Sequence, residues 1–152
     1  MNFKPNLSKS GGDEPKYDTV DKYMVSVTEL VTFSPDQNIV DVIDIILEKR
    51  ISGAPVLDNQ GRLVGILSEK DCLRLIIDRA YHNLPNQKST VETYMTTAVR
   101  SVEPTLDVVK AANEFLIAPV RRFPVVENGK LLGQISRRDI LRAAREINTT
   151  NW

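Results

Sequence analysis

Residues 51–76 read ISGAPVLDNQGRLVGILSEKDCLRLI, and residues 120–141 read VRRFPVVENGKLLGQISRRDIL. In both stretches a short apolar run opens at a proline, a polar turn follows, and a second apolar run ends at a charged segment. Two short apolar runs separated by turn residues are typical of a β-hairpin. The second turn contains Asn128-Gly129, the strongest short-range hairpin signal, whereas the first turn, DNQG, is longer. Each stretch therefore predicts a hairpin that leads into a helix.

The landmarks around these stretches recur at fixed distances. A second proline precedes the strand proline by 20 residues in both copies, at Pro35 and at Pro104, and the strand glycine precedes an aspartate by 6 residues in both. Upstream stands nearly the same hexapeptide, TVDKYM at 19–24 and TVETYM at 90–95. Such self-similarity indicates a tandem repeat. We interpret each hexapeptide as a short helix, with its threonine as the N-cap, at the head of one copy.

Apolar side chains in the remaining segments follow the helical period. Between proline and hairpin they fall at i, i+3, i+4, i+7 and i+8, which predicts an amphipathic helix in each copy. These residues are Ile39, Val42, Ile43, Ile46 and Leu47, and Val108, Ala111, Ala112, Phe115 and Leu116. A further helix is predicted after each hairpin, with its buried face on Leu73, Ile76, Ile77 and Ala80, and on Ile140, Leu141, Ala144 and Ile147. The fold class is α/β (α+β), with two β-α-β-β-α repeats.

The repeat also predicts the domain organisation. We expect a flexible tail at 1–16, a first repeat at 17–82, a linker at 83–89, a second repeat at 90–148 and a C-terminal tail at 149–152.

Composition excludes several function classes. Twenty basic and twenty acidic residues cancel, so no global positive field favours nucleic acid or an anionic membrane. One cysteine and one histidine leave neither a disulfide framework nor a His/Cys zinc site. No apolar run reaches a membrane span and the polar start lacks the apolar core of a signal peptide, so we expect a cytoplasmic protein. Cys72 has no evident base and is interpreted as a small buried side chain, and we expect no catalytic residues.

The most informative short motif is S-x-x-D, which stands at the strand-to-helix junction of both copies, at Ser68 to Asp71 and at Ser136 to Asp139. One interpretation is a capping-box variant, in which the serine oxygen and the acid satisfy free backbone N–H groups. The other is a ligand site, because the N-terminus of a helix attracts phosphate or ribose hydroxyls. Both interpretations stay open at this point.

Charge distinguishes the two copies. Arg137 and Arg138 lie in the first turn of a helix, where each positive charge opposes the helix dipole by roughly 0.3 to 1 kcal/mol. Arg121 and Arg122 precede the strand proline, where the first copy has uncharged residues. A bound anion would relieve this clustering, and a solvated surface cluster is the alternative.

Together these stretches resemble a tandem pair of CBS domains, the modules named after cystathionine β-synthase, over about residues 17–148. The resemblance implies two repeats packed as a pseudo-twofold pair, with clefts that bind adenosine-containing ligands such as AMP, ADP, ATP or S-adenosylmethionine. In the family this binding serves regulation and not catalysis. No enzyme or channel domain accompanies the pair in this sequence, so we expect a separate regulated partner protein.

The resemblance also implies roles for individual residues. Asp71 and Asp139 correspond to the acid that holds ribose hydroxyls, and Ser68 and Ser136 to the hydroxyl beside ribose or phosphate. Residues that flank the base or reach phosphates, or that line the adenine side, correspond to Ser52, Gly53, Ala54, Arg121, Arg122, Phe123, Thr97 and Ala98. We place the phosphates at the second copy, beside Arg121, Arg122 and Arg138.

Two classes of function follow, and within the first a sensor of S-adenosylmethionine is the alternative to a sensor of an adenine nucleotide. The first is a sensor that binds an adenine nucleotide, chiefly at the second copy, and signals to a partner. The alternative is a ligand-free dimerisation scaffold in which S-x-x-D merely caps helices; a homodimer could form through small-residue helix faces such as Ala111 and Ala112, or Ala143 and Ala144.

Overall fold

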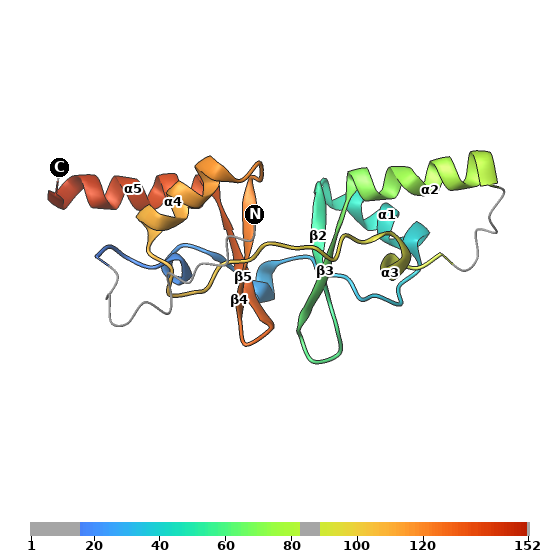
Figure 1. The fold of residues 1–152 in the computed structure, drawn as a ribbon, viewed down its shortest axis with the longest axis horizontal. Helices are drawn as coiled ribbons and strands as arrows, with labels where there is room; N and C mark the ends of the chain where they lie inside the picture. The colour runs from blue at the N-terminus through green and yellow to red at the C-terminus, as the bar shows by residue number, and fades with distance from the viewer. Residues whose placement is uncertain (1–15, 83–88, 152) are drawn as a thin grey trace. The chain divides into compact units, whose positions relative to one another are not determined.

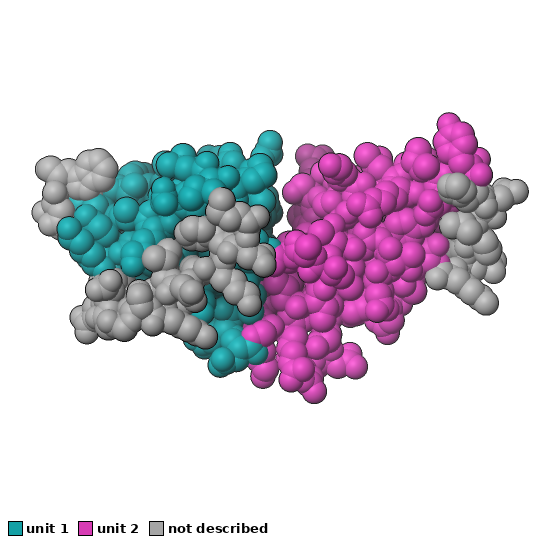
Figure 2. Space-filling view, viewed as in Figure 1, with its two compact units in different colours: residues 1–29, 100–128, 132–152 teal, residues 30–99, 129–131 magenta. Residues whose placement is uncertain are grey.

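A computed structural model of the chain describes residues 16–82 and 89–151. These residues form two compact units, coloured separately in Figure 2. Unit 1 takes them from 16–29, 100–128 and 132–151, and unit 2 from 30–82, 89–99 and 129–131. Each unit therefore contains segments from both halves of the chain.

Unit 2 contains a hairpin and three helices (Figure 1). The hairpin consists of β2 (Gly53–Leu57) and β3 (Leu63–Ser68), which pair antiparallel, so the first predicted hairpin is confirmed. The helices are α1 (Ile39–Lys49), α2 (Glu69–His82) and α3 (Val91–Tyr94).

Unit 1 has a three-stranded sheet in the order β1-β5-β4. Its elements are η2 (Val20–Lys22), β1 (Val25–Ser26), η3 (Val27–Glu29), α4 (Val108–Ile117), β4 (Arg122–Glu127), β5 (Lys130–Ser136) and α5 (Arg137–Asn151). Asn128 and Gly129 have φ angles of 51° and 82°, the left-handed conformation that a tight hairpin turn requires. The second predicted hairpin is thus confirmed, together with the mixed helix and strand class.

Side-chain caps begin the first long helix of each unit. The Asn38 side-chain oxygen accepts the Val40 N–H at 2.8 Å, and Asp107 Oδ1 accepts the Val109 N–H at 2.7 Å. Asp107 is only 4% exposed and also accepts the Tyr17 N–H at 3.0 Å. These caps satisfy N–H groups that have no partner within the helix.

Each unit has its own apolar core. In unit 2 the core residues are Phe33, Ile39, Val42, Ile46, Ala54, Val56, Leu67, Cys72, Leu75, Val91 and Tyr94. In unit 1 they are Val20, Val102, Val108, Ala111, Phe115, Ala118, Phe123, Val125, Ile135, Ile140 and Ala143.

The hexapeptide at 19–24 packs in unit 1, against the hairpin and last helix of the second copy. The Val20 side chain is fully buried, and its N–H donates to the Leu106 carbonyl at 2.9 Å. The Tyr23 hydroxyl donates to Glu146 on α5. A Cβ built on Gly133 of β5 would lie 2.9 Å from the Met24 sulfur, so the absence of a side chain at Gly133 makes room for Met24.

The hexapeptide at 90–95 makes the equivalent contacts in unit 2, with the first copy. Val91 is fully buried, and the Tyr94 hydroxyl donates to Asp78 Oδ2 on α2 at 2.8 Å. A Cβ on Gly65 of β3 would lie 2.7 Å from the Met95 sulfur. The repeated phrase is therefore a three-point anchor of valine, tyrosine and methionine, and each phrase anchors to the other copy along the chain.

The threonines that open these hexapeptides, Thr19 and Thr90, take the N-cap position but their side chains make no cap hydrogen bond. Thr19 Oγ1 donates to Asp21 instead. The expected N-cap position of the threonines is thus confirmed and both short helices form, although neither threonine side chain caps its helix. The tail and linker expected at 1–16 and 83–89 lie almost entirely outside the described residues.

The buried face expected for α2 is also wrong. Leu73, Ile76 and Ile77 are 58%, 59% and 52% exposed, whereas Cys72 and Leu75 are 7% and 3% exposed. The helix has two apolar stripes, and the buried stripe, with Cys72 and Leu75, begins next to the buried residue Asp71. On α5 the expected face is confirmed at Ile140, which is buried, and at Ile147, which is half-buried against the core. Leu141 is 67% exposed instead, Ala143 is buried and Ala144 is half-buried.

No helix within residues 16–82 and 89–151 combines the length and apolar character needed to cross a bilayer.

Candidate functional site

The first S-x-x-D motif forms a reciprocal capping box at the start of α2. Asp71 Oδ2 accepts both the Ser68 N–H and the Ser68 hydroxyl at 2.9 Å, and Ser68 Oγ accepts the Asp71 N–H at 3.2 Å. The Asp71 residue is only 4% exposed. The local fold of strand, turn and helix thus holds a buried carboxylate with one oxygen committed to the cap.

The second S-x-x-D motif repeats this geometry at the start of α5. Asp139 Oδ2 accepts the Ser136 N–H at 2.8 Å, and Ser136 Oγ accepts the Asp139 N–H at 3.2 Å. The Asp139 residue is 5% exposed. The capping-box interpretation is therefore confirmed for both motifs, which leaves open whether the other carboxylate oxygen binds a ligand.

The second carboxylate oxygen, Oδ1, has different partners in the two copies. Asp71 Oδ1 accepts the Thr96 hydroxyl at 3.1 Å, and Arg74 Nη2 lies 3.8 Å away. Asp139 Oδ1 is paired with the Arg142 guanidinium, one helical turn further along α5. The sequence analysis missed these residues, although S-x-x-D-x-x-R occurs in both copies and could have indicated the arginines.

The expected ligand-binding residues of the first copy come together in unit 2. Ser52 is exposed, and its carbonyl accepts the Glu69 N–H at 2.9 Å, which joins the start of the hairpin to the start of α2. Gly53 lies opposite Ser68 in the strand register, and a Cβ on Gly53 would lie 2.6 Å from the Leu67 carbonyl oxygen. Ala54 is buried in the core, so its side chain faces away from solvent.

Thr97 and Ala98 also belong to unit 2. Both are exposed, and they directly follow Thr96, whose hydroxyl donates to Asp71 at 3.1 Å. This segment, which is the beginning of the second copy in sequence, thus lies beside the S-x-x-D motif of the first copy.

The arginines gather in unit 1, around the start of β4 and of α5. Arg121, Arg122, Arg137 and Arg138 are all exposed. The Arg137 N–H donates to the Arg121 carbonyl at 3.1 Å, and Arg137 Nε donates to the Val120 carbonyl at 3.2 Å. With the Gln134 amide oxygen turned toward it, Arg122 donates to that oxygen at 3.2 and 3.3 Å. The two pairs of arginines that are 16 residues apart in sequence are therefore neighbours.

Phe123 is a core residue of unit 1. It is 1% exposed, and its ring centroid lies 4.5 Å from that of Phe115. The Arg100 guanidinium lies 5.6 Å from the Phe123 ring centroid and also pairs with the buried carboxylate of Glu114. Because the Phe123 ring is buried against Phe115 and Arg100, only its backbone is in a position to flank a base.

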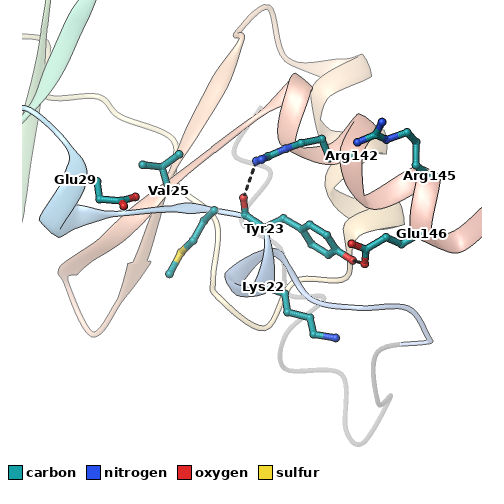
Figure 3. A pocket seen from close by; sticks show the side chains of 8 residues that line it. Lys22, Tyr23, Val25, Glu29, Arg142, Arg145 and Glu146 are labelled. Atoms are coloured by element: carbon teal, nitrogen blue, oxygen red, sulfur yellow. Dashed lines mark hydrogen bonds between the residues drawn. The ribbon is translucent and has the colours of Figure 1, made fainter.

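A pocket of about 600 Å³ lies between α5 and the segment that carries the first hexapeptide (Figure 3). Its lining residues are Lys22, Tyr23, Met24, Val25, Glu29, Arg142, Arg145 and Glu146. The hydrogen bond to Glu146, together with burial, raises the pKa of the Tyr23 hydroxyl. Arg142 Nη2 also donates to the Tyr23 carbonyl at 3.4 Å, drawn as a dashed line in Figure 3.

Cys72 follows Asp71 of the first motif directly and is a buried thiol. It is 7% exposed, and burial raises its pKa, with a further contribution from the carboxylates of Asp71 and Glu69. A raised pKa disfavours the thiolate that nucleophilic chemistry requires. The interpretation of Cys72 as a small buried side chain is confirmed. Among the described residues no cluster of His, Cys, Asp and Glu could hold a metal ion.

Sequence comparison finds the same repeat. The model of the CBS domain family matches residues 20–78 and 91–146. An uncharacterised 17.7 kDa protein of Acidianus ambivalens is 30% identical over 84% of this chain and 75% of its own length. The chloroplastic CBS domain-containing protein CBSX1 of Arabidopsis thaliana is 31% identical over 85% of this chain. The chain spans 65% of CBSX1, less than two thirds of its length.

Comparison with solved structures agrees. A crystal structure of CBSX2 in complex with AMP matches with a TM-score of 0.74 and 30% identity, over 87% of this chain and 98% of that one. A crystal structure of CbpB in complex with c-di-AMP matches with a TM-score of 0.74 at 17% identity, which supports the fold alone.

Proposed function

Because this chain belongs to the CBS domain family, we propose that it is a regulatory module that binds an adenosine-containing ligand, AMP, ADP or ATP, and signals to a protein partner. The observation that carries the proposal is the buried carboxylate at each strand-to-helix junction, whose Oδ1 faces other side chains and does not serve the cap. The AMP complex of CBSX2 supports an adenine nucleotide as the ligand class.

We assign the ribose hydroxyls to Asp71 and Asp139. A carboxylate held by a capping box keeps its position without a ligand, so binding does not have to order it. Hydroxyl donors on a ribose are the natural partners of such an acceptor.

We assign the phosphates to the second copy, near Arg121, Arg122 and Arg138. These exposed cations belong to residues at the start of β4 and in the first turn of α5, which the Arg137 N–H to Arg121 carbonyl bond holds together, and the free N–H groups and the dipole of the α5 N-terminus favour an anion. Arg137 and Arg138 oppose the dipole in the ligand-free chain, and a bound phosphate would remove that cost. The first copy has Ser52 and Gly53 where the second has Arg121 and Arg122, so we expect weaker binding of phosphate there.

Calorimetric titration with AMP, ADP and ATP tests this assignment. Asp139→Ala and Arg122→Ala should weaken binding roughly tenfold or more, the cost of one lost hydrogen bond to a charged group, and more than Asp71→Ala does. Lys110→Ala, which removes an exposed cation from α4, is the matched control and should leave the affinity unchanged. An equal loss from Asp71→Ala would contradict the asymmetry, and the absence of binding by the wild-type chain would contradict the function.

The proposed role is regulatory and not enzymatic, and we place it in the cytoplasm without nucleic-acid or membrane partners. The chain is 33% identical to an inosine-5'-monophosphate dehydrogenase of Aquifex aeolicus over only 23% of that enzyme, so its activity is not carried over.

A second function, a homodimerisation scaffold, is favoured by exposed apolar side chains on helices of both units. In unit 2 they are Leu47, Leu73, Ile76, Ile77 and Tyr81, and in unit 1 they are Val109, Leu116, Ile117 and Leu141. Of the alanines expected to form such a face, Ala111 and Ala143 are buried in the core of unit 1, whereas Ala112 and Ala144 are half-buried. Ile77→Glu and Leu116→Glu should each shift a dimer toward monomer in native mass spectrometry, whereas a wild-type monomer would contradict this proposal.

A further inference from the structure

The two copies treat their buried carboxylates differently, and the cause lies one residue after each hexapeptide. Thr96 follows TVETYM and donates its hydroxyl to Asp71 Oδ1 at 3.1 Å. Val25 follows TVDKYM at the equivalent position and has no hydroxyl to donate. The strand pairing confirms the equivalence, because Thr96 lies opposite Ile66, next to Gly65, and Val25 lies opposite Gln134, next to Gly133.

Arg142 takes the place of the missing hydroxyl. Its guanidinium pairs with Asp139 Oδ1, the oxygen that the capping box leaves over, and Nη2 also donates to the Tyr23 carbonyl at 3.4 Å (Figure 3). In the first copy Arg74 stands at the same position of the motif but lies 3.8 Å from Asp71 Oδ1. Arg142 is thus bound to the carboxylate and to the hexapeptide segment at once.

We propose that Arg142 is a self-ligand of Asp139, which occupies the site of a ribose hydroxyl and must be displaced before a nucleotide binds at the second copy. This inference rests on the proposed function, in which Asp139 receives the ribose. The Arg142 side chain is 57% exposed, so it can swing into solvent or toward the 600 Å³ pocket that it lines. The buried Asp139 carboxylate would then accept from the ribose hydroxyls in place of the guanidinium. Its release also breaks the contact with the Tyr23 carbonyl, which couples ligand binding to the anchoring of residues 19–24.

The physical consequence is a competition that lowers the affinity of the second copy. A partly exposed ion pair is weak, so its removal is expected to tighten ribose binding roughly two- to fivefold. In the first copy the Thr96 hydroxyl can rotate to accept from a ribose, and the 3.8 Å pair with Arg74 competes less.

The test compares wild-type protein, Arg142→Gln and the matched control Arg74→Gln by calorimetric titration with AMP, with 2′-deoxy-AMP and with adenosine. Arg142→Gln is expected to bind AMP two- to fivefold more tightly, with a smaller gain for 2′-deoxy-AMP, while Arg74→Gln binds AMP as the wild type does. Adding Val25→Thr to Arg142→Gln supplies a hydroxyl in place of the guanidinium, and should leave AMP binding tighter than in the wild type, because a hydroxyl can rotate to accept from the ribose.

The outcomes separate the two proposals. If the wild type binds AMP and Arg142→Gln binds it equally or more weakly, Arg142 is not a competitor and this inference is overturned while the nucleotide function stands. A loss of affinity for AMP that spares adenosine would mean that Arg142 holds phosphate instead. If neither protein binds any adenosine compound, the proposed function fails, and the self-ligand fails with it.

Discussion

Replacing Gly133 by alanine should break the attachment of the first hexapeptide to the second copy. An alanine Cβ would lie 2.3 Å from the Val25 carbonyl oxygen, 2.9 Å from the Met24 sulfur and 3.2 Å from Met24 Cγ. The methionine can rotate away, but the carbonyl belongs to β1, whose residues Val25 and Ser26 pair with Gln134 and Gly133 of β5. The substitution therefore forces the two strands apart.

The cost can be bounded from these contacts. Overpacking typically costs about 1 to 3 kcal/mol, and a clash with backbone lies at the upper end because backbone has no alternative rotamer. Gly65→Ala is the matched comparison, since its Cβ would meet the Met95 sulfur at 2.7 Å and the Thr96 carbonyl oxygen only at 3.0 Å. We expect a loss of about 2 to 3 kcal/mol in the free energy of unfolding for Gly133→Ala, and of about 1 to 2 kcal/mol for Gly65→Ala.

Urea denaturation followed by circular dichroism measures both losses, and double-mutant cycles separate their causes. Met95→Ala should relieve most of the clash at Gly65, because there a flexible side chain is the closest neighbour. Met24→Ala should relieve little at Gly133, where the carbonyl oxygen stays in the way. A Gly133→Ala protein within about 0.5 kcal/mol of the wild type, or a larger loss for Gly65→Ala, would refute the reasoning.

Three further predictions concern other parts of the two units. Asp107→Ala should lower the free energy of unfolding by roughly 2 kcal/mol and Asn38→Ala by roughly 1 kcal/mol, because Asp107 is buried and also accepts the Tyr17 N–H. Equal losses for the two variants in urea denaturation would contradict this prediction. Backbone N–H groups, chiefly that of Arg62, lower the pKa of the Asp58 carboxyl group in the folded protein. The ionised carboxylate therefore stabilises the fold fully above the ordinary carboxyl pKa near 3.9, and this stabilisation is lost as the pH falls through the lowered pKa of the folded state. The stability difference between wild type and Asp58→Asn should therefore shrink below about pH 4, and a difference that grows with acid would have the wrong sign. Cys72 should react with a thiol reagent far more slowly in native than in urea-unfolded protein, since burial raises its pKa; equal rates would show that the thiol is accessible.

Local patterns predicted the elements of this fold because their causes are local. The Asn128-Gly129 turn adopts the left-handed conformation that its residues favour, and both S-x-x-D motifs form the capping boxes that their spacing allows. The buried face of α2 could not be predicted in this way. Cys72 and Leu75 form one helical stripe and Leu73, Ile76 and Ile77 form another, and only the packing of the whole helix decides between them.

The partners of the hexapeptides were also beyond a local pattern. Sequence order places TVDKYM at the head of the first copy, but Val20, Tyr23 and Met24 contact unit 1, which contains the hairpin of the second. Nothing in a repeat tells which of two equivalent hairpins a segment will choose, because both offer a glycine on the strand and an acid on the helix. Which hairpin each hexapeptide packs against depends on the path that the chain takes between the two copies.

The partners of the two buried carboxylates could not be predicted from local patterns either, but one of their causes can be found in the sequence. The difference between the partners of the two buried carboxylates does not lie in the S-x-x-D motifs, which are alike, but in Thr96 against Val25. A threonine hydroxyl completes one buried carboxylate, whereas valine leaves the other to the Arg142 guanidinium. Once the cross-packing of the hexapeptides is known, this difference can be read from the two aligned copies. The position after the repeated phrase therefore sets how strongly each carboxylate is held before a ligand arrives.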